Sequence, residues 1–171
     1  MKYHLLFPLL AAGLVLLCAC GVQKEPPQTE AETEVSEIVS FSFCHTTSWA
    51  EDCYRLDLTR DGDSVHLHAE ELFSGGRVVD TMTDDAAMAR LEELADTYSL
   101  DQWNGFDKSG KHVTDGSTFT LNITRADGIT VSAHGNNRFP ERYSEFAPAI
   151  RALYDELMQR YADREGKDDA L

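Results

Sequence analysis

Two Asp-Gly pairs, each set between segments of alternating polarity, constrain the fold of this chain more than any other feature. The pairs are Asp61-Gly62 and Asp127-Gly128. An Asp-Gly pair with alternating apolar residues on both sides is typical of a tight β-hairpin, because glycine accepts the positive φ angle of the turn. The segments predicted to pair are 53–60 with 64–71, and 117–125 with 129–134.

Other segments extend this prediction to an α+β fold. Alternation also predicts strands at 38–44 and 77–82, which makes the first hairpin part of an antiparallel meander of four strands. Next comes a helix with an apolar stripe at helical spacing, formed by Met88, Leu91, Leu94, Ala95 and Tyr98. Residues 99–116 are predicted to be a long irregular loop.

After the second hairpin, Phe146, Ile150, Leu153 and Leu157 mark the buried side of a last helix. Pro148 is expected to separate a short helical piece from a main helix over 147–162. The predicted order is therefore ββββα, a loop, then ββα, with the two helices packed on one face of the sheet.

The net charge of the chain argues against polyanionic partners. The 171 residues include 15 basic and 30 acidic side chains, so the formal net charge is −15. A surface this acidic repels nucleic acid and anionic lipid headgroups, and it favours solubility or a basic partner.

The amino-terminal region carries Lys2, an apolar run from Leu5 to Leu17, and then Leu17-Cys18-Ala19-Cys20. This pattern resembles the lipobox of bacterial lipoproteins, from which Cys18 is a mild departure. The resemblance implies cleavage before Cys20, fatty acylation of its sulfur, and attachment to the outer side of a cell membrane or an outer membrane. An ordinary secretory signal with a chance cysteine and an uncleaved anchor are the alternatives.

This interpretation divides the chain into four parts. Residues 1–19 would be a lipoprotein signal peptide, and 20–36 the lipidated cysteine with a disordered tether rich in Glu, Thr, Pro and Gln. Residues 37–162 would form a single globular domain, and 163–171 a flexible acidic tail.

Two cysteines, Cys44 and Cys53, remain once Cys20 carries lipid. An even pair in the oxidising compartment that the lipobox implies predicts a disulfide. Alternation supports it, because Phe43 and Tyr54 would face the core and turn both cysteines to the other face. A metal-binding or reactive thiol pair is the alternative.

Aromatic residues in predicted loops are candidates for ligand binding. Trp49 stands between the predicted cysteine partners, and Trp103 stands in the long loop, while Asn136, Asn137 and Arg138 follow the second hairpin. Aromatic rings beside amide and hydroxyl groups are typical of sites that hold a peptide or a glycan. The alternatives are that the rings close the ends of the core and that the polar residues form turns and caps.

A weaker candidate is a metal site at His66 and His68, which lie on the polar face of one strand. A two-residue Asp61-Gly62 turn would place Asp57 opposite His66 and Arg55 opposite His68, with Glu70 nearby. Imidazoles and carboxylates suit zinc or copper, but the Arg55 charge opposes a cation. A hydrated Asp–His pair is the alternative.

No local motif of catalysis, nucleotide binding or zinc binding occurs in the sequence, so neither an enzyme nor a cofactor is expected. The region from Asp115 to Pro140 resembles uncharacterised domains of bacterial surface lipoproteins, which implies no activity. The expected function is a membrane-anchored, non-enzymatic module that binds a peptide, glycan or protein. A structural or inhibitory envelope protein and a weak metal-binding protein are the alternatives.

Overall fold

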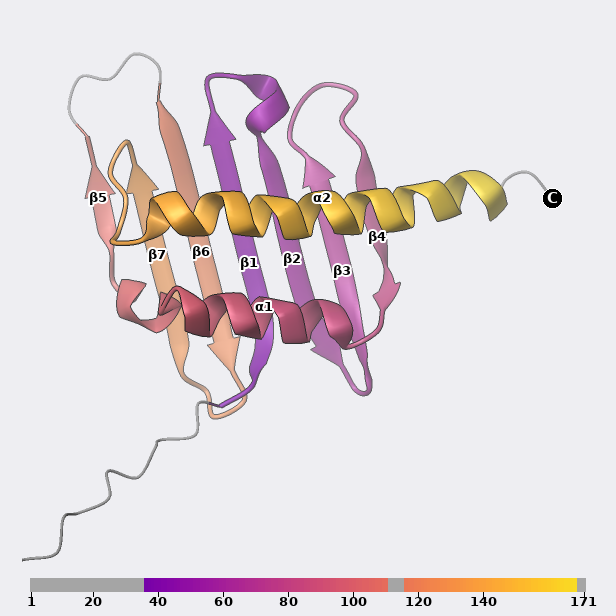
Figure 1. The fold of residues 1–171 in the computed structure, drawn as a ribbon, viewed down its shortest axis with the longest axis horizontal. Coiled ribbons are helices and arrows are strands. Elements are labelled where there is room, and N and C mark those ends of the chain that lie inside the picture. Colours follow the sequence, from indigo (N-terminus) through magenta and orange to yellow (C-terminus); the bar gives the residue numbers. More distant parts are fainter. Residues whose placement is uncertain (1–35, 111–115, 169–171) are drawn as a thin grey trace, which may run out of the picture. The chain divides into compact units, whose positions relative to one another are not determined.

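The computed structural model describes residues 36–110 and 116–168, which are organised around one sheet of seven strands (Figure 1). The strand order is β4-β3-β2-β1-β6-β7-β5. The strands are β1 (Ile38–Thr47), β2 (Tyr54–Asp61), β3 (Ser64–Glu71), β4 (Val78–Thr83), β5 (Asp107–Ser109), β6 (Ser117–Arg125) and β7 (Thr130–Asn136). All neighbours pair antiparallel except β5 and β7, which are parallel.

Two helices, α1 (Ala86–Thr97) and α2 (Tyr143–Asp168), lie across the same face of this sheet (Figure 1). Two short 3-10 turns, η1 (Ala50–Asp52) and η2 (Leu100–Trp103), complete the elements. The core lies between the sheet and the helices, and its largest side chains include Phe41, Phe43, Phe119, Phe146 and Tyr154, all fully buried. The other face of the sheet has no helix over it in the part of the chain that the structure describes (Figure 1).

The predicted α+β class, the four-stranded meander and the second hairpin are confirmed. The meander and the hairpin are joined into one sheet because β1 pairs with β6 as well as with β2. The apolar stripe of the first helix is also confirmed: Met88, Leu91 and Ala95 are buried, and Leu94 and Tyr98 pack against the core.

The prediction that 99–116 is wholly irregular was wrong. This segment contains η2 and the edge strand β5. Residues Asp107, Lys108 and Ser109 of β5 are all exposed, and they join the sheet only by pairing beside β7. A strand with no buried side chain has no alternating apolar pattern, so its sequence does not reveal it.

Pro148 does not divide the last helix as predicted. Helix α2 begins at Tyr143 and continues through Pro148 to Asp168, which includes residues 163–168 of the predicted tail. Pro148 is exposed and lies in the second turn. Its ring therefore meets solvent, and the missing N–H removes only one hydrogen bond near the start of the helix. Residues 169–171 lie outside the described residues.

The predicted register of the first hairpin was also wrong. Asp61 pairs with Ser64, so Gly62 and Asp63 form the turn, and Gly62 takes the positive φ of 61°. Positive φ at the first central position is the geometry that glycine supports in a type II′ turn. As a result Thr59, instead of Asp57, stands opposite His66, and Asp57 stands opposite His68.

Candidate functional site

The two tryptophans predicted to form one ligand site lie in different environments. Trp49 is 76% exposed in the connection between β1 and β2, whereas Trp103 is 3% exposed. The Trp103 ring packs at 5.2 Å from that of Phe146 and 6.0 Å from that of Phe119, both edge to face. Trp103 is therefore a core residue, as the alternative interpretation allowed, and the prediction of a shared Trp49 and Trp103 site was wrong.

An ion pair between a buried arginine and a half-exposed aspartate fixes the turn that carries Trp103. The side chain of Arg125 is 5% exposed, and its guanidinium donates to both carboxylate oxygens of Asp101, at 3.2 and 2.8 Å. Asp101 belongs to η2 and Arg125 ends β6, so the pair ties η2 to the sheet. Alternation from Phe119 through Leu121 and Ile123 already placed Arg125 on the inner face, and that was the signal for this pair.

Asn136 and Asn137 serve the backbone. The Asn137 side-chain oxygen accepts from the N–H of Ser117 at 2.9 Å, and its amide nitrogen donates to Asn136 at 2.6 Å. The backbone of Asn137 is left-handed, with φ of 53°. Both amides thus stabilise the chain as it leaves β7, in agreement with the turn-and-cap alternative. Arg138 is exposed beside them.

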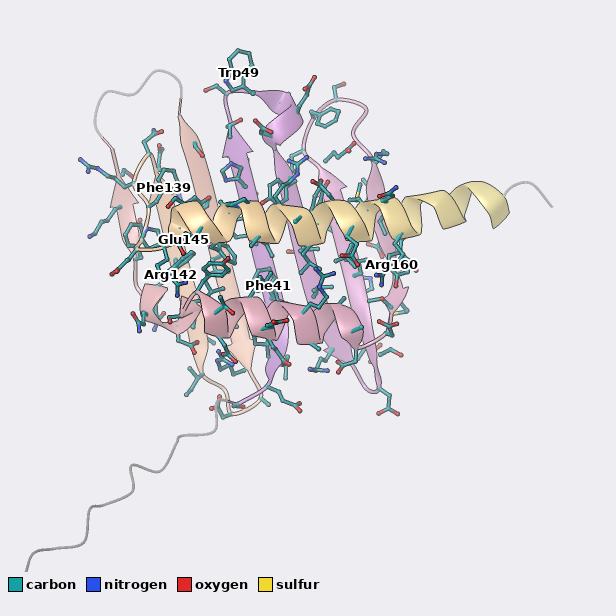
Figure 2. The ribbon with its side chains drawn as sticks, viewed as in Figure 1. Phe41, Trp49, Phe139, Arg142, Glu145 and Arg160 are labelled. Carbon is teal, nitrogen blue, oxygen red and sulfur yellow. The ribbon has the colours of Figure 1, made fainter. Side chains whose placement is uncertain are left out.

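A hollow of about 370 Å³ lies beside these residues, between β5 and the start of α2. One wall is aromatic or apolar and is formed by Tyr98, Trp103, Phe106, Phe139 and Pro140. The other lining residues are polar or charged: Ser99, Gln102, Lys108, Glu141 and Arg142. Phe139 is 40% exposed at its rim and stacks on Tyr143 with 4.5 Å between ring centroids. Figure 2 shows Phe139 and Arg142 together at this end of α2.

Two cations reach the hollow from different elements. The ammonium of Lys108 lies 5.1 Å from the centre of the Phe106 ring, and the guanidinium carbon of Arg142 lies 5.1 Å from that of Tyr98. Arg142 is held by the carbonyl oxygen of Thr97 and, at 3.4 Å, by Glu145. The exposed Lys108 makes no ion pair with any residue in 36–110 or 116–161. No carboxylate of these described residues neutralises its charge.

The backbone of the hollow is strained at two positions. Ser99 and Arg142 have φ values of 54° and 62°, which side-chain-bearing residues rarely adopt. Such conformations persist only where the surrounding structure imposes them, and they are frequent at binding sites. Neither position had a sequence signal, because a positive φ without glycine or asparagine leaves no compositional mark.

A second hollow of about 350 Å³ also has Phe106 in its lining. Its lining is polar apart from Phe106 and consists of Asn104, Gly105, Asp107, Ser132 and His134. His134 and Asp107 share a hydrogen bond of 3.3 Å, and Asn104 accepts from the backbone of Ser132 at 3.1 Å.

Another histidine, His45 of β1, is half-buried and contacts the first residue of α2. Its Nδ1 shares a hydrogen bond of 2.9 Å with the hydroxyl of Tyr143. Burial lowers the pKa of His45, and the Arg151 charge lowers it further, against an opposing effect of Asp52. His45, Asp52 and Arg151 also line a third hollow, of about 210 Å³. Across the described part of the chain, no hydrogen bond joins a serine or cysteine side chain to a histidine.

His66 and His68 share a carboxylate that sequence reasoning missed. Asp80 of β4 bonds His66 at 2.8 Å and His68 at 2.9 Å. Hydrogen bonds from His68 and His66 lower the pKa of Asp80. Within residues 36–110 and 116–161, no group of three His, Cys, Asp or Glu side chains is arranged to hold a metal ion. Both imidazoles instead bond the same carboxylate, and through it they link β3 to β4.

Cys44 and Cys53 are free thiols, so the structure does not contain the predicted disulfide. The residue opposite Cys44 is Arg55, and Cys53 lies two positions beyond it, outside β2. Cys53 is instead bonded within its own loop: the N–H of Thr47 donates to its sulfur at 3.2 Å. Burial raises the pKa of the Cys44 thiol, which disfavours the reactive thiolate. Cys20, the predicted lipidation site, lies outside the described residues.

Neither α1 nor α2, the helices of the described ranges, is long and apolar enough to cross a membrane. A scan of family models, a search of curated proteins and a search of solved structures each found no match to this chain.

Proposed function

We propose that the protein is a lipid-anchored, extracytoplasmic binding module without enzymatic activity. Its ligand site would be the hollow between β5 and α2, and its ligand a short peptide or glycan that carries a carboxylate. Attachment through Cys20 follows from the lipobox-like Leu17-Cys18-Ala19-Cys20, and ligand binding follows from the hollow.

One observation carries the proposed binding. An open hollow combines aromatic walls with two cations, Lys108 and Arg142, in a chain whose net charge is −15. Rings of Phe106 and Phe139 offer apolar contact area, while the ammonium of Lys108, which lies over the Phe106 ring, offers a charge-assisted hydrogen bond. The volume of about 370 Å³ is in the range of small-ligand sites, about 300–1,000 Å³.

Calorimetry of the full-length protein with two probes, tri-glutamate and a uronic acid disaccharide, tests the site. We expect at least one probe to bind, and Lys108→Gln to weaken that binding about tenfold, because a hydrogen bond to a charged group contributes about 1.5–3 kcal/mol. Phe139→Ser should weaken it to a similar degree.

The matched control is Arg138→Gln, which removes one exposed positive charge close to the hollow but not among its lining residues. It should leave the affinity within about twofold, because an exposed charge that makes no direct contact with the ligand contributes little. Equal losses for Lys108→Gln and Arg138→Gln would contradict a specific site and indicate attraction by charge alone.

The anchor has a test of its own. Mass spectrometry of the native protein should find a diacylglyceryl group on the sulfur of Cys20, and Cys20→Ser should release the protein from membranes. An unmodified amino terminus on a membrane-free protein would contradict the placement without bearing on the hollow.

One observation favours a second function, a structural or inhibitory protein that acts through its open sheet face. Asp57 lies on that face, and its Oδ1 is buried without a hydrogen-bond partner in the described structure. A buried carboxylate oxygen without a hydrogen bond is rare in native folds and calls for a functional explanation. If this function holds, Thr120→Arg, placed on the same face, should abolish co-purification of an envelope protein while probe binding in the hollow is unchanged.

A further inference from the structure

The exposed Trp49 stands on a rigid turn. The Thr47 hydroxyl accepts from the N–H of Trp49 at 3.0 Å and donates to its carbonyl at 2.8 Å. The same carbonyl accepts from the N–H of Asp52 at 3.0 Å and from the Cys53 thiol at 3.5 Å. The one thiol hydrogen of Cys53 is shared between this carbonyl and that of Thr47, at 3.3 Å. Thus three hydrogen bonds besides the thiol contact hold the backbone of Trp49, although its ring is 76% exposed.

A large, exposed ring on a fixed backbone loses little conformational entropy when a partner covers it. Tryptophan is among the residues that most often dominate the binding energy of protein interfaces. Trp49 is the most exposed of the large apolar side chains of residues 36–110 and 116–161, ahead of Ile129 at 57%. It therefore differs from the scattered, half-exposed apolar residues of an ordinary surface.

The charges beside the ring define the kind of partner. Glu51 and Asp52 follow Trp49 in η1, and both are exposed. Arg151, a cation that lines the same hollow as Asp52, is paired with Asp155 at 2.9 Å and lies over the Tyr54 ring. An indole face with two carboxylates attracts an arginine or lysine, because the ring holds a cation over its face and the carboxylates accept its hydrogen bonds.

The Trp49 turn lies far from Ile38, where the chain enters the fold. This position favours a protein as the partner. β1 runs from Ile38 to Thr47, and Trp49 follows its far end, about 30 Å from Ile38 at about 3.3 Å per residue. Figure 2 shows Trp49 projecting beyond the ends of the strands.

We infer that the turn of Trp49, Glu51 and Asp52 is the docking site of a basic protein that presents an arginine side chain. The arginine stacks on the indole and is bonded by the two carboxylates. The net charge of −15 steers such a partner toward the chain from a distance, which makes association fast and sensitive to salt. This site is separate from the hollow between β5 and α2, and it does not depend on ligand binding there.

Titration of the full-length protein with hexa-arginine, followed by fluorescence at 20 mM and 300 mM salt, tests the inference. We expect binding at low salt with a change in the emission of the exposed tryptophan. Trp49→Ala and the double variant Glu51→Gln, Asp52→Asn should each weaken binding about tenfold, measured by calorimetry, since a desolvated cation–ring contact contributes about 2 kcal/mol. Trp49→Phe, which keeps an aromatic face, should lose less.

Two matched controls separate a specific turn from general acidity. Glu93→Gln with Asp96→Asn removes two exposed carboxylates from α1, and Ile129→Ala removes another exposed apolar side chain. Both controls should bind hexa-arginine within about twofold of the wild type. Absence of binding at low salt, or equal losses for the α1 double variant and the η1 double variant, would overturn the inference.

Discussion

Trp103 and Trp49 occupy opposite environments in one domain. Trp103 is buried at one end of the core, in a turn that the Arg125–Asp101 ion pair ties to the sheet. Trp49 is exposed on a turn that hydrogen bonds within the loop hold together. The first ring builds the wall of a hollow with cations at its rim, and the second projects beside carboxylates.

This difference shows that an aromatic residue in a loop has no fixed role. What decides the role is whether the surrounding segments bury the ring in the core, as for Trp103, or leave it in solvent, as for Trp49. The two proposed sites therefore differ in shape and in the sign of their charge, and their ligands should not compete. The following predictions test that contrast.

The largest expected effect is the loss of stability on truncating the buried ring. Trp103→Ala should lower the free energy of unfolding by about 3–5 kcal/mol, because it removes the edge-to-face contacts with Phe119 and Phe146 and leaves a cavity. Trp49→Ala should change it by less than about 0.5 kcal/mol. Urea denaturation of both variants measures the difference. Similar losses in the free energy of unfolding would contradict the distinction between a core and a surface tryptophan.

Breaking the Arg125–Asp101 ion pair should lower the free energy of unfolding by a smaller amount. Asp101→Asn leaves the buried guanidinium of Arg125 without its anion, and should cost about 1–3 kcal/mol since the Asp101 side chain is itself 48% exposed. Asp107→Asn is the control, because that carboxylate is 84% exposed and should matter by less than about 0.5 kcal/mol. Equal effects in urea denaturation would show that the pair does not hold η2.

Relieving the backbone strain at Ser99, beside the hollow, should stabilise the fold instead. Ser99→Gly should raise the free energy of unfolding by about 0.5–1 kcal/mol, because glycine accepts the φ of 54° without steric cost. Ser144→Gly, at a helical position of α2, should lower it instead. A loss in both variants, measured by thermal unfolding, would mean that Ser99 is not strained.

The smallest effect concerns pH. Burial lowers the pKa of His45 in the folded state below its ordinary value of about 6.5, so the folded protein binds this proton less readily than the unfolded chain does. Stability should then be complete above about pH 6.5 and fall as the pH drops below it. His45→Gln should flatten the dependence over pH 5–7, and an unchanged slope in that variant would exclude His45 as its source.

Sequence reasoning succeeded where side chains alternate between core and solvent. The bounds of β3 and β6 agree with the predicted 64–71 and 117–125, because Val65, Leu67 and Ala69, and likewise Phe119, Leu121 and Ile123, are buried in turn. The burial pattern fixes the register of a strand on its face, and the pattern is visible in the sequence.

The candidate site was less predictable, because it depends on contacts between distant segments. Lys108 lies on a strand without buried side chains, and Asp80 meets His66 and His68 only through a register set by the connection 72–77. The disulfide prediction used only the alternation of side chains, which placed Cys44 and Cys53 on the same face of the sheet. It did not consider that Arg55 lies opposite Cys44, two positions away from Cys53. Alternation along a strand determines which face of the sheet a side chain lies on, but not which residue of the next strand lies opposite.

The central place of β1 has a consequence for how the protein reaches its fold. One edge of β1 pairs with β2, close in the chain, but the other waits for β6, where Phe43 meets Leu121. During synthesis β1 is made before β6, so one edge of β1 keeps its backbone N–H and C=O groups unpaired until β6 follows. Folding of such non-local pairings is slow, and the open edge attracts other chains. Variants that delay β6 should therefore aggregate during synthesis even where the finished fold is stable.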